Sequence, residues 1–158
     1  MAHELITDWH GYHLAVKRLL SIAETSVMIY SGELSSFKLE SAENLASIER
    51  LLNTTHSTTI QIALRDDQNW QTTHPRLARL FINHSHLVTI RQAPSEFSHL
   101  RDSMLIVDHR HSLIRFEQNL ARSKLLLDES PEVRPYIDRF LEICEISGQA
   151  FSFKTLGL

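Results

Sequence analysis

The sequence has few of the features that mark nucleotide-binding, secreted or membrane-spanning proteins. Glycine occurs four times in 158 residues, so no glycine-rich loop is available to hold a phosphate, which disfavours a P-loop or dinucleotide-binding fold. The single cysteine, Cys144, cannot form an internal disulfide, and its apolar neighbours indicate a buried structural thiol in a reducing compartment. The longest apolar runs, such as residues 104–107, are far shorter than the roughly 20 residues of a membrane-spanning helix.

A sustained run of positive charge is also lacking. The chain carries 16 basic and 19 acidic residues, interspersed along its length, for a net charge of −3. Without a cationic stripe to neutralise phosphates, nucleic acid is disfavoured as a partner. The N-terminus has an acidic residue where a secretory signal carries positive charge, and it lacks a continuous apolar segment. We therefore expect a cytoplasmic protein without membrane association.

The pattern of apolar residues predicts an alternation of helices and strands within one domain, residues 1–158. The expected helices cover residues 8–24, 41–52, 74–82 and 130–146, and the expected strands cover residues 25–30, 58–64, 87–91, 103–107 and 112–116. The last two strands should form a hairpin, and the segment between this hairpin and the last helix is polar and should be irregular. This order predicts an α/β fold, a mixed β-sheet of about five to six strands with helices on both faces.

Two short motifs carry a resemblance to a known superfamily. Residues 103–108 read Ser-Met-Leu-Ile-Val-Asp, and residues 74–77 read His-Pro-Arg-Leu. With the element order, over roughly residues 8–146, they resemble one half of the phospholipase D-like superfamily, and more closely the small bacterial proteins that carry a single degenerate copy of that half. Active members bring two His-x-Lys-x4-Asp motifs together, from two halves or from a dimer, so the resemblance implies a homodimer.

The catalytic residues of that motif are replaced in this chain. With Asp108 on the motif's aspartate, Arg101 falls on the histidine and Ser103 on the lysine, and placing His99 on the histidine instead leaves an apolar residue on the aspartate. The superfamily's Gly-Ser-x-Asn falls on residues 115–118, Arg-Phe-Glu-Gln. The superfamily uses the histidine as its nucleophile and the lysine to neutralise the phosphate. Because an arginine cannot attack phosphorus, the resemblance favours a protein without phosphodiesterase activity.

A remnant of the motif could still bind a small anion or a phosphodiester. Arg101 and Ser103 would project from the same face of one strand, Arg115 lies on the adjacent strand, and Asp108 completes the candidate site. The alternative, which we favour, is that these residues lie at the rim of the hairpin and form a surface ion pair with Asp102 or Asp108.

Two further features could form binding sites. Trp70 and His74 lie in and beside the polar segment that follows the strand at 58–64, which predicts an interaction surface unless Trp70 folds back to anchor the loop. His109 and His111 could offer imidazoles to a metal ion, but a turn scatters its side chains and no third ligand completes a set. We therefore expect a solvated turn there, and neither a metal nor a cofactor.

The leading hypothesis for function is a non-catalytic interaction or regulatory domain on a degenerate phospholipase D-like fold, acting as a homodimer or through a protein partner. The second hypothesis is a small-anion or phosphodiester-binding module, and the third is a residual phosphodiesterase or nuclease. Trp9, Tyr12 and His13 fall near one another on the first helix. They form either an aromatic patch for a partner or ordinary packing.

Overall fold

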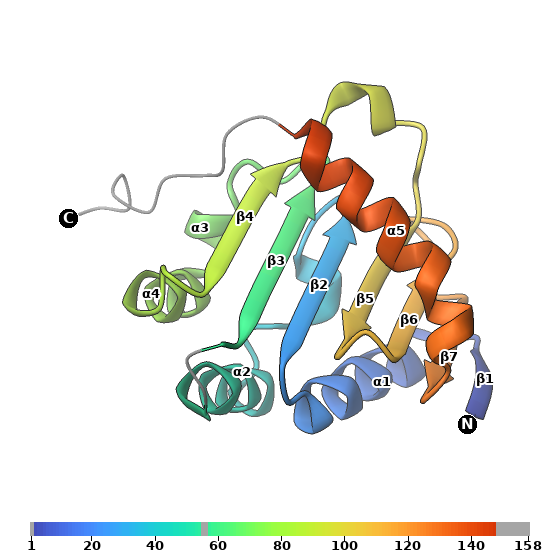
Figure 1. Ribbon diagram of the computed structural model, residues 1–158, viewed down its shortest axis with the longest axis horizontal. Helices are drawn as coiled ribbons and strands as arrows, with labels where there is room; N and C mark the ends of the chain where they lie inside the picture. Colours follow the sequence, from blue (N-terminus) through green and yellow to red (C-terminus); the bar gives the residue numbers. More distant parts are fainter. Residues whose placement is uncertain (1, 55–56, 148–158) are drawn as a thin grey trace.

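The computed structural model describes residues 2–54 and 57–147, which build a β-sheet covered by helices (Figure 1). The strands are β1 (Ala2–Ile6), β2 (Ser26–Ser31), β3 (Thr59–Leu64), β4 (Val88–Gln92), β5 (Ser103–Val107), β6 (His111–Arg115) and β7 (Ser123–Leu127). The helices are α1 (Trp9–Ile22), α2 (Ala42–Thr54), α3 (Trp70–Thr73), α4 (Pro75–Asn83) and α5 (Ser130–Ile146), with short 3-10 helices at Ser35–Phe37 and Ser95–Phe97. The end of the expected domain, residues 148–158, lies outside the described residues.

The sheet is mixed and has seven strands in the order β1-β7-β6-β5-β2-β3-β4. β2, β3 and β4 run parallel. The other neighbouring pairs, β2–β5, β5–β6, β6–β7 and β7–β1, are antiparallel. The predicted α/β class, mixed sheet and hairpin are confirmed. The predicted strand count of five to six is too low because β1 and β7 were not expected.

The prediction of an irregular segment before the last helix is wrong for β7. Its Leu125 and Leu126 are buried, and the strand pairs with β6 on one side and β1 on the other. β1 itself is exposed at every position except Ile6, so it lacks the apolar face by which a strand is recognised in a sequence. The pairing of β1 with β7 joins segments that lie far apart in the chain, whereas β7 pairs with β6 directly before it.

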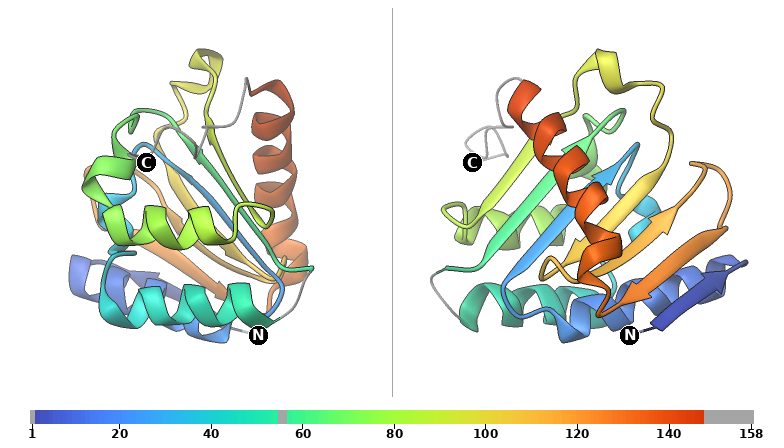
Figure 2. Two further views of the ribbon diagram at one scale, coloured as in Figure 1. Left: turned by 90° about the vertical axis from the view of Figure 1, so that its left-hand side faces the viewer. Right: turned by 45° about the vertical axis from the view of Figure 1, so that its right-hand side comes forward.

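Helices cover both faces of the sheet, as predicted. Helices α1, α2 and α4 pack on one face, and α5 crosses the other (Figure 2). Asp8 caps α1 by accepting a hydrogen bond of 2.7 Å from the Gly11 amide, and α5 buries Val133, Ile137 and Phe140 against the sheet. None of the helices in the described part of the chain is long and apolar enough to cross a membrane.

One edge of the sheet collects residues from five strands. The parallel strands β2, β3 and β4 end there. Because β5 is antiparallel to β2, its first residue, Ser103, lies at the same edge. Arg115 at the end of β6 is the register partner of Ser103. Polar side chains that are distant in the sequence therefore meet at this edge, which we call the carboxyl edge.

Candidate functional site at the carboxyl edge

Asp108 lies at the opposite end of β5 from the other candidate residues. Its carboxylate accepts hydrogen bonds of 2.8–3.1 Å from the backbone amides of Glu24, Thr25 and Ser26 and from the Thr25 hydroxyl. Partial burial acts to raise the pKa of Asp108, but these donors outweigh burial and hold the pKa below its usual value. Asp108 therefore fastens the end of β5 to the start of β2, and it does not share a site with Arg101.

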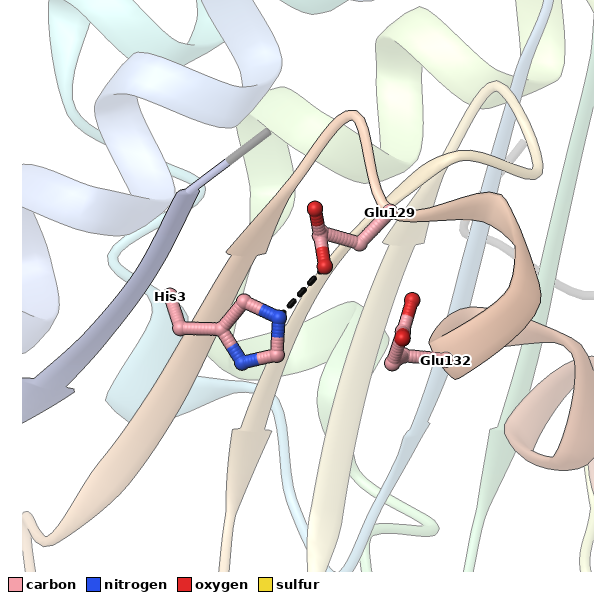
Figure 3. A group of neighbouring side chains, drawn as sticks. All are labelled: His3, Glu129 and Glu132. Atoms are coloured by element: carbon pink, nitrogen blue, oxygen red, sulfur yellow. Dashed lines mark hydrogen bonds and ion pairs between the residues drawn. The ribbon is translucent and has the colours of Figure 1, made fainter.

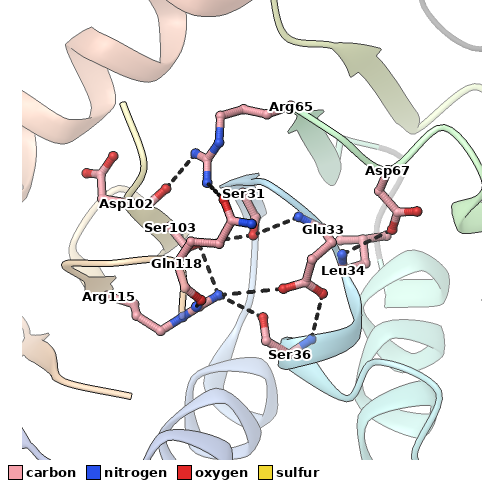
Figure 4. A network of polar contacts seen from close by, with 10 residues as sticks. All are labelled: Ser31, Glu33, Leu34, Ser36, Arg65, Asp67, Asp102, Ser103, Arg115 and Gln118. Atoms are coloured by element: carbon pink, nitrogen blue, oxygen red, sulfur yellow. Dashed lines mark hydrogen bonds and ion pairs between the residues drawn. The ribbon is translucent and has the colours of Figure 1, made fainter. Parts of the chain in front are cut away.

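Ser103 and Arg115, by contrast, are in direct contact (Figure 4). Nη2 of Arg115 donates a hydrogen bond to the Ser103 hydroxyl at 3.1 Å and another to the Ser36 hydroxyl at 2.8 Å. The Ser103 hydroxyl also lies 3.0 Å from the hydroxyl of Ser31, at the end of β2. Ser31, Ser103 and Arg115 are fully buried, so these groups form a closed polar cluster.

The charge of Arg115 is compensated inside the protein. A carboxylate oxygen of Glu33 lies 3.9 Å from Nη2, and Nη1 donates to the backbone carbonyl of Gln118. The guanidinium lies 5.3 Å from the ring centre of Trp9 and 5.1 Å from that of Tyr12. Burial raises the pKa of Tyr12 to about 12, although Arg115 acts in the opposite direction. Arg115, Glu33 and the three serines are called the Arg115 cluster below.

Arg101 remains outside this cluster because β5 begins at Ser103. The Arg101 side chain is half-exposed and forms an ion pair of 3.5 Å with Glu117. The expected ion pair with Asp102 or Asp108 is therefore replaced by one with Glu117. The predicted common face of residues 101 and 103 does not exist, and only two of the four predicted site residues are in contact.

The geometry of the Arg115 cluster does not suit phosphodiester cleavage. The resemblance places the catalytic lysine at Ser103, whose hydroxyl is buried and bonded to its neighbours. The guanidinium group of an arginine cannot act as the nucleophile in such a reaction. The polar groups at this position are bonded to one another, and Ser103 and Arg115 present no exposed surface to a substrate.

Three residues beside the cluster were not among the predicted site residues. Arg65 follows β3, and its guanidinium donates to the Asp102 carbonyl at 2.7 Å and to the Gln118 side-chain oxygen at 3.1 Å. A Cβ atom on Gly32 would lie 2.8 Å from that same oxygen, so a larger residue at this position would require the end of the Gln118 side chain to shift. One signal in the sequence was available, because Gln118 stands where the superfamily motif has the amide of asparagine.

A hollow of about 500 Å³ opens next to Arg65, between the ends of β3 and β4 and the loop that precedes β5. Its lining residues include two arginines, one aspartate and several neutral polar residues: Arg65, Arg101, Asp66, Gln68, Gln92, Ser95 and Ser98. Arg65 is 8% exposed, and the described residues provide neither a hydrogen-bond partner for its Nε nor a carboxylate in an ion pair with it. We call this the Arg65 hollow.

Trp70 and His74 do not form the predicted interaction surface. Trp70 is fully buried with its ring centre 6.2 Å from that of Phe81, and His74 is also buried, with Nδ1 3.1 Å from the Trp70 carbonyl oxygen. The polar loop contains the short helix α3, which turns the indole inward. Burial of a large aromatic ring outweighs the polarity of its neighbours in the sequence, so the alternative of a loop anchor is the one observed.

The histidines of the hairpin turn are not arranged as a metal site. Nδ1 of His111 accepts a hydrogen bond of 2.9 Å from the backbone amide of Asp128. Burial, with a contribution from Arg110, lowers the pKa of His111. The described residues contain one group of three potential metal ligands, and neither His109 nor His111 belongs to it.

Comparison with known proteins adds a family and a set of structures. The model of the family described as Domain of unknown function (DUF7931) matches residues 10–156. No curated protein matches the sequence.

Solved structures share the fold, among them the following three. TrmBL2, described as an archaeal chromatin protein with a novel mode of DNA binding, superposes with a TM-score of 0.69 at 13% identity, over 94% of this chain and 54% of TrmBL2. Nuc from Salmonella typhimurium, described as a phospholipase D family member, gives 0.65 at 13% identity over 95% and 97% of the two chains. NucT from Helicobacter pylori superposes with a TM-score of 0.58 at 13% identity, over 95% of this chain and 99% of NucT.

These structures confirm the predicted phospholipase D-like fold and, at this identity, nothing beyond the fold. This chain spans about half the length of TrmBL2. The DNA binding described for TrmBL2 is a property of that protein. The expectation against nucleic acid, which came from the net charge and the lack of a cationic stripe, is not supported by these comparisons. The match along nearly all of Nuc and NucT agrees with a chain built on a single copy of the phospholipase D-like half.

Proposed function

We propose that this chain, which belongs to the family described as Domain of unknown function (DUF7931), is a non-catalytic interaction or regulatory domain on a phospholipase D-like fold. The observation that carries the proposal is the Arg115 cluster. The fully buried guanidinium of Arg115 is held by two hydroxyls, a carbonyl, two aromatic rings and a carboxylate where the superfamily keeps its catalytic groups. A domain whose remnant site is closed in this way acts through its surface.

The start of α1 and the loop after β6 support association of two copies, as the resemblance implies. Three large apolar side chains of these segments are exposed: Trp9 at 38%, Phe116 at 45% and Leu120 at 59%. The Trp9 ring contacts the guanidinium of Arg115, and Phe116 and Leu120 lie in the loop that follows β6. Phe116 lines a hollow with Tyr136 and Arg139 of α5, on the face of the sheet opposite to α1, and exposed large apolar residues are typical of interaction surfaces. We propose that a second copy covers them.

Analytical ultracentrifugation over a range of concentrations tests this proposal. We expect the wild type to dimerise, and we expect Phe116→Asp with Leu120→Asp to raise the dimer dissociation constant at least about tenfold, because charge is depleted from interface cores. Leu141→Asp is the matched control, since Leu141 is 46% exposed on α5. A wild type that stays monomeric, or a double variant that dimerises like the control, would refute the homodimer.

The absence of catalysis has its own test. Bis(p-nitrophenyl) phosphate and single-stranded DNA should be hydrolysed no faster by the protein than by buffer, with or without a metal chelator. Hydrolysis that persists in chelator and disappears in Arg101→Ala would contradict the proposal. Hydrolysis that the variant retains would come from a contaminating enzyme, and repurification should then remove it and restore the expected result.

A second candidate function, binding of a small anion, is favoured by the Arg65 hollow. Arg65 is a buried cation without a paired carboxylate among the described residues, and such a charge is costly unless a counter-ion is supplied. Arg101 lines the same hollow, and it is half-exposed with an ion pair of 3.5 Å that an incoming anion can displace. The anion site expected from the sequence would thus keep Arg101 and exchange Ser103 and Arg115 for Arg65.

Thermal unfolding in inorganic phosphate tests anion binding. Phosphate should raise the Tm relative to chloride of equal ionic strength, because a ligand that binds the folded state stabilises it, and Arg101→Ala should abolish most of that rise. Arg134→Ala is the control, since Arg134 is 73% exposed on α5. An equal rise in wild type, Arg101→Ala and Arg134→Ala would show a general salt effect and refute the site.

A further inference from the structure

Three potential metal ligands lie together where the N-terminal strand passes the start of α5 (Figure 3). They are His3 on β1, Glu129 directly before α5, and Glu132 in the first turn of α5. One ligand atom from each lies within 4.8 Å of the other two. The cluster joins two segments that are distant in the sequence, and it lies apart from the Arg115 cluster.

Glu129 is the buried carboxylate of this cluster. The residue is 5% exposed, and its carboxylate contacts Nε2 of His3. A buried carboxylate needs a cation close to it. The backbone carbonyl of Arg110 accepts a hydrogen bond of 2.9 Å from the Glu129 amide, but the Arg110 guanidinium is already paired with Asp128.

Glu132 adds a second negative charge to the same place. It is exposed, and it takes part in none of the ion pairs among the described residues. The carboxylates of Glu129 and Glu132 thus lie within 4.8 Å of each other beside the His3 imidazole. Like charges so close repel each other, and one divalent cation would neutralise both.

We propose that His3, Glu129 and Glu132 bind a divalent transition metal of the Zn²⁺ class. One imidazole nitrogen with two carboxylate oxygens suits zinc, whereas Mg²⁺ and Ca²⁺ prefer oxygen ligands alone. Zinc binds these atoms at about 2.0–2.2 Å, so they must approach each other to about 3.4 Å. His3 and Glu132 are exposed enough to rotate toward Glu129, and a water molecule would complete the coordination.

The metal would fasten β1 to the start of α5. β1 is the outermost strand, paired on one side with β7, and it buries only Ile6. Such a strand has little apolar burial to hold it, so its attachment should respond to a ligand. Metal binding at His3 therefore controls the stability of the N-terminal strand, independently of the proposed function.

Isothermal titration of tag-free protein with Zn²⁺ tests the site. We expect one zinc ion per chain, and binding at least about tenfold weaker in His3→Ala and in Glu132→Gln, the loss typical when a ligand or its support is removed. His86→Ala is the control because His86 is exposed in the segment between α4 and β4. Hydrogen exchange of the β1 amides should slow when zinc is added to the wild type and not when it is added to Glu132→Gln.

The results separate a specific site from binding by scattered histidines. Zinc binding that both cluster variants retain, or that His86→Ala weakens as much as His3→Ala does, would overturn the proposal. Circular dichroism confirms that each variant is folded, and Glu132→Gln changes an exposed residue, so its loss of zinc binding cannot be attributed to unfolding.

Discussion

Two buried arginines lie at the carboxyl edge of the sheet, and their surroundings differ. Arg115 has a carboxylate, two hydroxyls and two aromatic rings around its guanidinium, and it is fully buried. Arg65 donates to a carbonyl and to an amide oxygen, packs on the Tyr30 ring at 4.9 Å, and lines an open hollow. The same residue type therefore closes one site and leaves a charge available at the other.

In the proposed function, this difference separates a closed cluster at Arg115 from a candidate anion site at Arg65. Nε lacks a hydrogen-bond partner among the described residues in both arginines. The charge of Arg115 has the Glu33 carboxylate 3.9 Å from Nη2, whereas no carboxylate of the described residues forms an ion pair with Arg65. Substitutions at the two arginines should therefore have unequal effects.

The largest effect is expected for Arg115→Met. The change removes the cation but leaves Glu33 and the buried hydroxyls without their partner, so we expect a loss of about 3 kcal/mol in the free energy of unfolding. Urea denaturation followed by circular dichroism measures it. Arg134→Met, at an exposed ion pair on α5, should change stability by less than about 0.5 kcal/mol. Equal effects of the two substitutions would mean that the Arg115 cluster contributes nothing to stability.

Asp108 provides a reference far from both arginines. Asp108→Ala should cost about 2 kcal/mol, because a carboxylate that accepts several amide hydrogen bonds is lost. The folded pKa of Asp108 is lowered, so its contribution is full above the unfolded pKa of about 3.9 and disappears as the pH falls through the folded pKa. Urea titrations at several pH values should show the wild type and the variant converging in acid. A difference that is constant with pH would contradict this role.

Gly32→Ala should lower the free energy of unfolding by less than either of these substitutions. It tests the contact between Gln118, beside the Arg115 cluster, and Arg65. The new methyl group would lie 2.8 Å from the Gln118 side-chain oxygen and 3.1 Å from Nη2 of Arg65, which costs about 1 kcal/mol when the side-chain end can shift. Urea denaturation measures the loss. An unchanged or higher stability would show that Gln118 is not held in place by Arg65.

The smallest loss is expected for Arg65→Met. This change removes two hydrogen bonds but also a buried charge without a paired carboxylate, so the net loss should stay below about 1 kcal/mol. The stabilisation of the wild type by inorganic phosphate should disappear in the variant. A loss as large as that of Arg115→Met would show that the two arginines are equivalent and would remove the contrast between them.

Much of the fold could be predicted because its signals are local. The apolar spacing after Ser130-Pro131 predicts α5 with the bounds that the structure has, and Asp8 caps α1 as its position indicates. β1 and β7 escaped prediction because their pairing with each other, such as Ala2 with Leu127, is invisible in a local window.

The sequence by itself determined the α/β class and most helices and strands, and it predicted the replacement of the superfamily's catalytic histidine and lysine. Only the tertiary structure decided which polar side chains meet. Arg115 bonds to Ser36, 79 positions away, while Arg101 is left at the surface with Glu117. Periodicity reports which face of an element is buried, whereas a binding site depends on strand order and register, which bring together residues from distant parts of the chain.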